Sequence, residues 1–369
     1  MKAIGIILAG GHNERLGPLA KQRAAAALPI GSCYRCLDFS LSNMTNSGIG
    51  KVAVLTQYNA RSLHDHLSSS KWWDFGRKQG GLFIFSPYLS EDNSYWFRGT
   101  ADSIHQNITY LKRSNEPYVI IASGDIIYKM DYNAVLQSHV ETGADITIVY
   151  KEMQDFDSSQ YGTLTLDEDG RLLEFEEKPL EPLSDLVSTG IYVISRTLLI
   201  EKLEQIIPEG RYDIVKDILI RYRKRLKIMG YRFDGYWHAV NSIETYFNAN
   251  MDFLKRDVRD LFTNQQPYIS TKPKDEPPAK YNANANARNC LVGSGSIING
   301  HINHAVLFRK VFTGDHSSIR NAIVMEGSYI GDNCVVENAI IDKEVVLSGG
   351  KQVIGEPDNP IVIAKGTVL

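Results

Sequence analysis

The chain is 369 residues long, which is more than one ordinary domain and favours two. Its hydrophobic fraction of 43% and charged fraction of 22% are those of a soluble globular protein. A formal net charge of -3 gives no reason to expect a nucleic acid or an anionic membrane as partner, and no apolar run approaches the ~20 residues that span a bilayer. The apolar residues 4–8 run straight into Gly10 and Gly11, so we expect a buried first strand rather than a signal peptide, in a cytoplasmic protein.

Four cysteines are present, and two of them, Cys33 and Cys36, form a lone CxxC pair. No second pair of cysteine or histidine residues stands at metal-ligand spacing, so reduced thiols are favoured over a zinc or redox site. His64 and His66 are two residues apart and would point to different sides of a helix. These histidines are therefore poor candidates for metal ligands.

Short apolar segments alternate with amphipathic segments over the first two-thirds of the chain. Buried strands are expected at residues 3–8, 52–56, 118–122, 146–150 and 190–194, with helices between them, for example at residues 101–112 and 132–142. This alternation predicts an α/β layer fold around a mostly parallel sheet. Ligands of such folds bind at the carboxyl ends of the strands, where the glycine-rich loops of this sequence fall.

Beyond residue 262 the sequence contains two further regions of different composition. Residues 263–285 combine prolines with polar residues and suit an extended linker, which separates an α/β domain at 1–262 from a domain at 286–369. In that last part the segments 304–307, 321–324 and 338–341 read HAVL, NAIV and NAII, each seventeen residues apart. A coil of three strands of about six residues has nearly this length, so we expect a hexapeptide-type parallel β-helix, with a β-sandwich of recurring turns as the alternative.

A glycine-rich turn follows the first expected strand. Gly10 and Gly11 can bring backbone N–H groups close to phosphates, and Arg15 can neutralise their charge, although such a turn alone is more often ordinary turn chemistry. Further blocks follow in order: Leu55-Thr56-Gln57-Tyr58, Arg98-Gly99-Thr100-Ala101-Asp102, Ser123-Gly124-Asp125, Phe175-Glu176-Glu177-Lys178-Pro179, Gly190-Ile191-Tyr192 and Gly235-Tyr236-Trp237. Together these blocks resemble the ADP-glucose pyrophosphorylases over essentially the whole chain.

The resemblance implies a Rossmann-like, GT-A-like nucleotidyltransferase domain followed by a left-handed parallel β-helix. It also implies the reaction of ATP with glucose 1-phosphate to give ADP-glucose and pyrophosphate, in glycogen synthesis. Asp125 would be one of two carboxylate ligands of Mg²⁺. The other implied positions are Gly10, Gly11, Arg15, Gln57, Gly99, Thr100 and Ala101 at the nucleotide, and Glu177, Lys178 and Gly190 at the sugar phosphate. Catalysis in such a reaction consists of positioning the phosphates and neutralising their charge.

Three departures from the family pattern fall inside the expected site. In the glycine turn, Asn13 and Glu14 replace the family's glycine and threonine, which adds a Cβ and a negative charge beside the phosphates. Ala25 replaces the lysine that acts on the reacting phosphates, and Ala239 replaces the second metal-binding carboxylate. Losing one preorganised charge typically costs about 10²–10³ in turnover, so the site is expected to be degenerate.

Local compensation is the alternative to a degenerate site, because Lys21 could replace the lost lysine and Asp234 or His238 the lost carboxylate. A misplacement of about 1 Å is itself costly in such a site, which weighs against compensation.

This sequence keeps the substrate-side residues and lacks the catalytic groups. In that combination it resembles the non-catalytic, regulatory subunit of the two-gene ADP-glucose pyrophosphorylases of Gram-positive bacteria. That resemblance implies a catalytic partner subunit in a heterotetramer, with Mg²⁺ weakly bound or absent in this chain. Two other interpretations are a weak adenylyltransferase, and a scaffold that binds neither ATP nor glucose 1-phosphate. Arg23 and Arg35 are expected at a regulatory anion site for phosphorylated effectors between the domains, although structural ion pairing explains them equally well.

Overall fold

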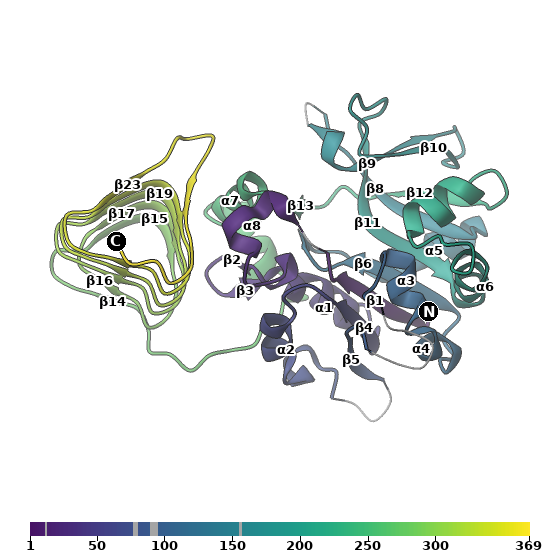
Figure 1. Ribbon diagram of the computed structural model, residues 1–369, viewed down its shortest axis with the longest axis horizontal. Helices are drawn as coiled ribbons and strands as arrows, with labels where there is room; N and C mark the ends of the chain where they lie inside the picture. Colours follow the sequence, from purple (N-terminus) through teal and green to yellow (C-terminus); the bar gives the residue numbers. More distant parts are fainter. Residues whose placement is uncertain (12, 77–79, 89–94, 155–156) are drawn as a thin grey trace.

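The computed structural model describes residues 1–11, 13–76, 80–88, 95–154 and 157–369. An N-terminal α/β domain packs against a C-terminal domain of stacked triangular coils (Figure 1). His12, inside the glycine turn, lies outside the described residues. Among the described residues, no helix combines the length and the apolar character that a membrane crossing requires.

A nine-stranded sheet forms the centre of the N-terminal domain. Its strands are β1 (Ala3–Ala9), β4 (Lys51–Thr56), β5 (Gly81–Phe85), β6 (Tyr118–Ser123), β8 (Ile146–Glu152), β9 (Gly162–Leu166), β10 (Leu172–Glu177), β11 (Leu186–Ser195) and β12 (Ile228–Arg232). Strands β5, β4, β1 and β6 run parallel to one another, and β12 runs parallel to β8. The long strand β11 runs antiparallel to β6 and β8 and joins the two parallel groups. The central strands are apolar on both faces because helices cover both sides of the sheet (Figure 1).

Most of the helices lie between the strands, as the alternating pattern predicts. They are α1 (Cys36–Asn46), α2 (Arg61–Leu67), α3 (Thr100–His105), α4 (Ile108–Lys112), α5 (Tyr132–Thr142), α6 (Arg196–Ile206), η5 (Val215–Ile220, a π-helical turn), α7 (Ile243–Asp252) and α8 (Arg256–Thr263). The single helix expected at residues 101–112 is wrong, because the segment breaks between α3 and α4. There the Asn107 side chain donates to the Ser103 carbonyl at 2.9 Å, a bond that competes with continued helix.

Short elements complete the N-terminal domain. They are the 3-10 turns η1 (Glu14–Ala20), η2 (Ala25–Ala27), η3 (Ser70–Trp73) and η4 (Ser158–Gln160) and the strands β2 (Pro29–Ile30), β3 (Tyr34–Arg35), β7 (Ile126–Tyr128) and β13 (Trp237–Ala239). The four cysteines are free, and burial raises the pKa of the Cys33 thiol to about 12. The CxxC pair therefore consists of inert thiols.

The C-terminal domain is a parallel β-helix. Its short strands are β14 (Lys280–Tyr281), β16 (Ile297–Ile298), β18 (Phe312–Thr313), β20 (Tyr329–Ile330) and β22 (Val346–Leu347). Its longer strands are β15 (Asn286–Val292), β17 (His301–Leu307), β19 (Ser318–Val324), β21 (Val335–Ile341), β23 (Gln352–Ile354) and β24 (Ile361–Ile363). Each of these strands pairs in parallel with a strand of a neighbouring coil, so the β-sandwich alternative is wrong. Strand β14 lies within residues 263–285, and the first coil therefore begins inside the segment expected to be linker.

Four of the longer strands, β15, β17, β19 and β21, turn a corner at one residue of left-handed conformation. Asn289, His304, Asn321 and Asn338 occupy this corner, with φ between 44° and 52°. Asparagine tolerates positive φ better than most residues, which explains why it recurs at this point of the seventeen-residue repeat. The Asn321 amide donates to the Asn338 side chain at 2.7 Å, so the corner residues form a polar ladder.

One outward face of the β-helix is covered by the N-terminal domain. The register aligns five residues beyond the asparagine corner into the docked column: Leu291, Val306, Ile323, Ile340 and Val362. Val306, Ile323 and Ile340 are fully buried in a cluster with Tyr246 and Phe253 from the end of the N-terminal domain. The two domains therefore share one apolar core.

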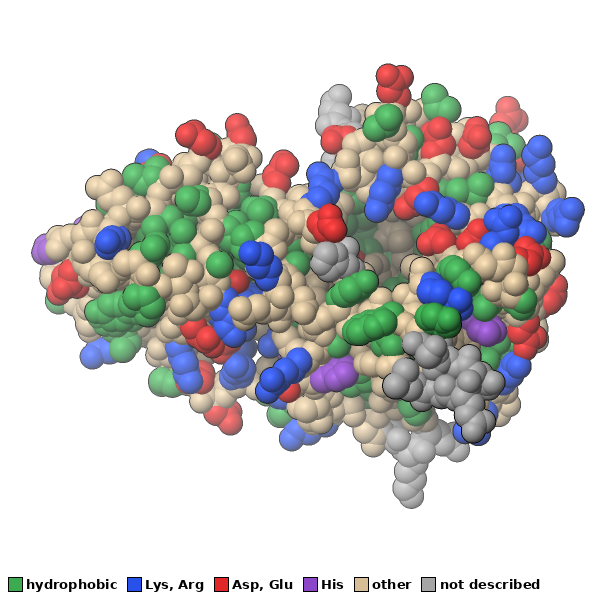
Figure 2. All heavy atoms as spheres, viewed as in Figure 1, with side chains coloured by type: hydrophobic (Ala, Val, Ile, Leu, Met, Phe, Trp, Pro, Cys, Tyr) green, Lys and Arg blue, Asp and Glu red, His purple; other side chains and the backbone are tan. Residues whose placement is uncertain are grey.

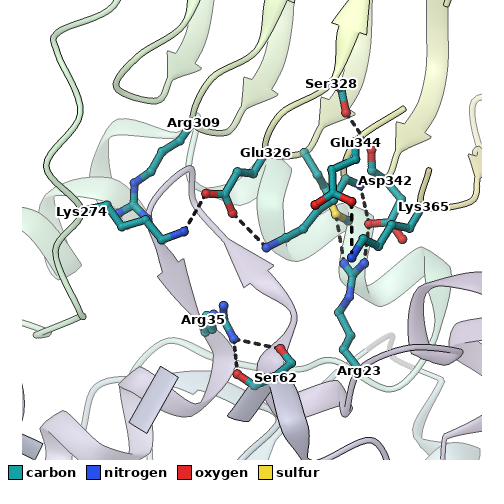
Figure 3. Close-up of polar contacts among 12 residues, drawn as sticks. Arg23, Arg35, Ser62, Lys274, Arg309, Glu326, Ser328, Asp342, Glu344 and Lys365 are labelled. Carbon is teal, nitrogen blue, oxygen red and sulfur yellow. Dashed lines mark hydrogen bonds and ion pairs between the residues drawn. The ribbon is translucent and has the colours of Figure 1, made fainter. Parts of the chain in front are cut away.

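A buried ion pair crosses the same interface. Nη2 of Arg23 lies 2.7 Å from Oδ1 of Asp342, and the two side chains are 5% and 1% exposed (Figure 3). Nη1 of Arg23 donates to the sulfur of Met325 at 3.4 Å. Arg23, which was expected to face a phosphorylated effector, therefore has its charge balanced by a carboxylate of the β-helix. Structural ion pairing accounts for this residue.

We predict that Asp342→Asn lowers the free energy of unfolding by about 3–5 kcal/mol, because it leaves the Arg23 guanidinium buried without a counter-charge. Chemical denaturation of the full chain measures the change. The matched control is Glu337→Gln, since Glu337 pairs with the exposed Arg320 on the surface. This substitution should lower the free energy of unfolding by less than about 1 kcal/mol. Equal effects of the two substitutions would contradict a structural role for the buried pair.

Candidate functional site

Five residues expected at a nucleotide line one cavity of about 190 Å³ at the carboxyl ends of β1 and β4. They are Gly10, Gly11, Gln57, Gly99 and Thr100, and Leu8, Leu55, Phe97, Arg98 and Ser103 complete the wall. The lining is mostly apolar and includes a few polar side chains, which is the usual composition of a site for a small molecule. The space-filling view shows the α/β domain hollowed between its two lobes (Figure 2).

Glycine is required at two points of this wall. A Cβ at Gly99 would lie 2.4 Å from the Tyr212 carbonyl oxygen, and one at Gly10 would lie 3.2 Å from the backbone nitrogen of Gln57. The Gln57 side chain bonds both backbone groups of Phe97: its oxygen accepts from the N–H at 2.6 Å, and its amide donates to the carbonyl at 3.2 Å. Gln57 thus fixes the loop that closes the cavity.

The segment Tyr212–Ile214 supports this wall from behind and was missed from the sequence. The Tyr212 carbonyl accepts from the backbone N–H of Ala101 at 2.8 Å, and Thr100 Oγ1 donates to Asp213 at 3.2 Å. Ala101 is fully buried behind the wall and does not line the cavity. An aspartate before an apolar run signals a helix start, and Asp213 does accept from the Lys216 N–H at 2.9 Å. That signal could not reveal that the same residue faces Thr100 from across the chain.

The two positions expected to hold a metal are neighbours in space. Strand β13 pairs antiparallel with β7, which places Ala239 opposite Ile126, directly after Asp125. The Val240 N–H donates to the Asp125 carbonyl at 2.9 Å. The Asp125 carboxylate accepts from Ser123, and burial raises its pKa. The backbones of the two positions are therefore adjacent, with one carboxylate where the resemblance implies two.

Three residues expected at the sugar phosphate gather beside Asp125. The positive charge of Lys178 acts on both Asp125 and Glu177, although burial leaves the pKa of each carboxyl raised. Lys178 itself has φ of 52°, an uncommon conformation for a residue with a side chain. Gly190, with φ of 75°, lies against Ser123 and Ile126. The structure thus brings Asp125, Glu177, Lys178 and Gly190 together at one edge of the sheet.

Two other expected residues lie apart from these groups. Arg15 does not line the nucleotide cavity; it lies near Asp157, whose pKa is lowered by hydrogen bonds from Ser159 and further by Arg15. Ala25 is buried in the apolar cluster that also contains Ile127 and Val240, next to the β7–β13 pair.

None of the three candidates for compensation reaches the site. His238 alternates with Ala239 along β13, bonds the Thr245 carbonyl at 2.9 Å and faces Asp252. Asp234 is exposed and pairs with Arg232 at 2.8 Å. Lys21 is exposed at the end of η1, and its backbone carbonyl accepts from Asn59.

The residues present do not fit a magnesium site with two carboxylates. Asp125 is a single half-buried carboxylate, Ala239 offers no oxygen, and the described chain contains no group of three or more acidic, histidine or cysteine residues suited to a metal ion. Magnesium requires near-octahedral oxygen ligation and is usually bound through one or two carboxylates plus substrate phosphates. We therefore derive no catalytic step through a metal held by this chain.

A second cavity, of about 200 Å³, lies between the domains and is rich in cations. Five basic residues line it together with Asp65, His66 and Glu326: Arg35, Lys272, Lys274, Arg309 and Lys343. They come from β3, the linker and two coils of the β-helix (Figure 3). Arg35 donates to the carbonyl and hydroxyl of Ser62 at 2.7 and 3.0 Å, so it is held in place by neutral acceptors.

Glu326 is the main counter-charge in this interdomain cavity. Its carboxylate lies 2.8 Å from Lys274 and 3.0 Å from Lys343. Burial alone raises the pKa of the Glu326 carboxyl, but the two lysines outweigh burial and hold its pKa at about 2. Glu326 therefore stays ionised at any physiological pH, and the stabilisation it gives is lost only as the pH falls from its unfolded value toward 2.

The sequence of the chain matches two known protein families. The nucleotidyl transferase family matches residues 4–256, and the family described as GlmU-like, C-terminal hexapeptide matches residues 277–359. The chain belongs to the nucleotidyl transferase family. The hexapeptide match agrees with the left-handed form of β-helix that the sequence predicts.

Full-length relatives carry one shared name. Proteins of Bacillus thuringiensis (strain Al Hakam), Bacillus anthracis and Bacillus mycoides (strain KBAB4), each named glucose-1-phosphate adenylyltransferase, are 38% identical to this chain over 371 aligned residues. The alignments cover 99% of this chain and 98% of each relative. Within the family, the chain is therefore homologous over its whole length to proteins of that name.

We predict that Ala239→Asp creates a divalent-cation site, because the β7–β13 pairing holds the backbone of position 239 next to that of Asp125 and the substitution supplies a second carboxylate there. Titration with Mn²⁺, followed by electron paramagnetic resonance, should show one bound ion where the parent chain shows none. Ala239→Asn, which has the same size without the charge, is the control and should bind no ion. Binding by the parent chain as tight as by Ala239→Asp would contradict the interpretation of the site as degenerate.

Proposed function

We propose that the chain is the regulatory, non-catalytic subunit of a glucose-1-phosphate adenylyltransferase, and that a homologous catalytic subunit carries out the reaction of ATP with glucose 1-phosphate. The observation that carries this proposal is the pair formed by Asp125 and Ala239. Their backbones are held side by side by the β7–β13 ladder, yet only one carboxylate is present. Full-length similarity to proteins named glucose-1-phosphate adenylyltransferase supports the reaction class of the assembly.

The missing groups are those that bear the charge of the reaction. Transfer of the nucleotidyl group requires neutralisation of negative charge on the phosphates by cations and metal-bound oxygens. Here Ala25 and Ala239 offer only methyl groups at two of the positions that bear such groups in the family pattern, and Glu14 adds a negative charge to the glycine-turn motif. The substrate-side residues Glu177, Lys178 and Gln57 remain in place, which favours a chain that binds ligands without converting them.

A weak adenylyltransferase is the second candidate, because the nucleotide cavity and the cluster around Lys178 are both formed. A measurement of turnover by the isolated chain distinguishes a subunit that binds ligands without converting them from a weak enzyme. We predict that the isolated chain, with ATP, glucose 1-phosphate and Mg²⁺, turns over far more slowly than the ~10 s⁻¹ of a median enzyme.

The reversion set Ala25→Lys, Ala239→Asp, Asn13→Gly and Glu14→Thr should raise that activity measurably, because it restores the lost charges and the glycine turn. A variant with only Ala25→Lys serves as the partial control and should gain less. Ordinary turnover by the unmodified chain would establish the second candidate in place of the first.

Regulation is proposed to involve the interdomain cavity. Its five cations outnumber its two carboxylates, so it suits a phosphorylated effector, and it touches both domains at once. Arg35 lines this cavity, whereas Arg23 is paired with Asp342 outside its lining. We therefore assign the regulatory anion to Arg35 and the four lysine and arginine residues around it, and Arg23 to the interface.

We predict that Glu326→Gln tightens the binding of inorganic phosphate about tenfold, equivalent to 1.4 kcal/mol, because an effector no longer competes with a built-in carboxylate for Lys274 and Lys343. Isothermal titration at low ionic strength measures the affinity. Glu337→Gln, an equal charge change at the exposed pair with Arg320, is the control and should leave it unchanged. Weaker binding by Glu326→Gln would place the anion elsewhere.

The assembly itself is tested by mixing. Co-expression with the homologous catalytic chain, followed by mass measurement, should give a mixed oligomer in which the catalytic chain turns over faster or binds substrates more tightly. A coupling of about 1–3 kcal/mol is typical of such regulation. If the two chains run separately on size exclusion and the catalytic kinetics do not change, the regulatory-subunit proposal is wrong.

A further inference from the structure

The linker is fixed to the surface of the α/β domain by hydrogen bonds to its backbone. Lys129 donates to the Gln265 carbonyl at 2.6 Å, and the Asn46 side chain donates to the Tyr268 carbonyl at 3.0 Å. Ile269 is buried in the apolar cluster that both domains share. The segment expected to be an extended linker therefore follows a fixed path over the α/β domain.

The backbone of Ser270, in the same segment, is held at both its N–H and its carbonyl. The N–H donates to Oγ of Ser42 at 2.9 Å. The carbonyl accepts from Nε1 of Trp73 at 3.0 Å and from Oγ of Ser42 at 3.3 Å. Ser42 belongs to α1 and Trp73 to η3, and both side chains are 1% exposed. Bonds that are shielded from water in this way hold Ser270 in one position.

Two lysines of the interdomain cavity follow Ser270 directly. Lys272 is two residues further along the chain and Lys274 four, and both line the cavity. Nζ of Lys272 donates to the Asp65 carbonyl in α2 at 2.8 Å, and Lys274 lies 2.8 Å from Glu326 (Figure 3). The position of Ser270 therefore decides where two of the five cations of the cavity stand.

Trp73 also contacts a second part of the cavity wall. Its ring meets the His66 ring edge to face, with centroids 5.3 Å apart. His66 lines the cavity, and its Nε2 lies 2.6 Å from one carboxylate oxygen of Asp38. The other oxygen of Asp38 accepts from the backbone N–H of Arg35 at 2.8 Å. Trp73 thus touches both the linker that carries two of the cations and the series of contacts that ends at a third.

We propose that Trp73 is a positioning residue of the interdomain cavity, and that it sets the linker lysines and Arg35 at the spacing that a phosphate group requires. Trp73 does not line the cavity, so it acts through Ser270 and His66. A site gains affinity when its cations are held in place before the ligand arrives, because less freedom is then lost on binding. This inference rests on the proposed function, which assigns a regulatory anion to this cavity, and adds the residue that organises it.

A role in the core alone is the alternative for Trp73. The residue packs in the apolar core of the α/β domain, and a buried indole N–H needs a hydrogen-bond partner in any case. The two roles differ in what a substitution changes. A role in the core affects the stability of the chain, whereas a positioning role affects its affinity for an anion.

Trp73→Phe separates the two roles, because it keeps an aromatic ring near His66 and removes the N–H that bonds Ser270. We expect the Kd for inorganic phosphate to rise about fivefold, the equivalent of one lost hydrogen bond, since the anion must then order the linker. Isothermal titration of the full chain at low ionic strength measures the Kd. The matched control is Trp72→Phe, which should leave the Kd unchanged, because Trp72 packs on the same core and carries Lys71 over its ring.

A second variant reaches the same contact from α1. Ser42→Ala removes the hydroxyl that bonds the Ser270 backbone and adds no volume, so we expect the Kd for phosphate to rise here too. Without phosphate, trypsin should cut the Lys274–Asp275 bond faster in Ser42→Ala and Trp73→Phe than in the parent chain. Thermal unfolding of each variant checks that it is folded.

Arg35→Gln shows whether the titrated phosphate occupies the cavity, since it removes a cation of the lining. If the parent chain binds no phosphate, or Arg35→Gln binds it equally tightly, the proposed regulatory site is wrong and the positioning role fails with it. If the parent chain binds phosphate through Arg35 while Trp73→Phe and Ser42→Ala leave the Kd unchanged, only the positioning role is overturned, and Trp73 is a core residue alone.

Discussion

The packing of the docked column on the end of the α/β domain is the contact on which the rest of the structure depends. A β-helix has no interior large enough to hold a ligand, and its coils are stabilised mainly by their neighbours. By burying Val306, Ile323 and Ile340 against Tyr246 and Phe253, the fold turns two domains into one core. Only within that fixed geometry can Arg23 meet Asp342, and only there do cations from β3, the linker and the coils enclose a common cavity.

This interface and the candidate site are close to each other along the chain. Arg23 is two residues before Ala25, and the same turn packs next to the β7–β13 pair that carries Asp125 and Ala239. A change in the position of the β-helix would therefore pull on the segment where the family pattern has its catalytic lysine. This link runs through the backbone and does not depend on the side chain at position 25, which is consistent with the regulatory role proposed above.

Much of the fold could be predicted from local patterns in the sequence. Runs of apolar residues located β1, β4, β6, β8 and β11 because these strands are buried on both faces, and the seventeen-residue repeat located the β-helix because each coil repeats the same contacts. The break between α3 and α4 could not be predicted, since it depends on one side-chain bond from Asn107. The first coil begins at Lys280, in a proline-rich segment whose composition gives no sign of the strand that pairs with β16.

For the candidate site too, some features could be predicted from the sequence and others could not. Motif order brought Gly10, Gln57 and Gly99 to one cavity, because the carboxyl ends of parallel strands share one edge of a sheet. Sequence could not separate the roles of Arg23 and Arg35, since both are arginines on one short segment. Their difference arises from a carboxylate more than three hundred residues away, which only the three-dimensional packing brings to Arg23. Asp213 was missed for a similar reason.

The last coil shows how this β-helix can change length. Strand β21 pairs with β23 before the corner and with β24 after it, and residues 355–360 leave the coil between them. Both registers survive this excursion, while Asn338 still donates to the Gly355 carbonyl at 3.0 Å where the next rung of the polar ladder would be. A corner thus accepts extra residues that a strand would not, because a strand must keep its side-chain alternation. Loops of new length or sequence can accordingly be added at the corners, by evolution or by design, without disturbing the coils that hold the two domains together.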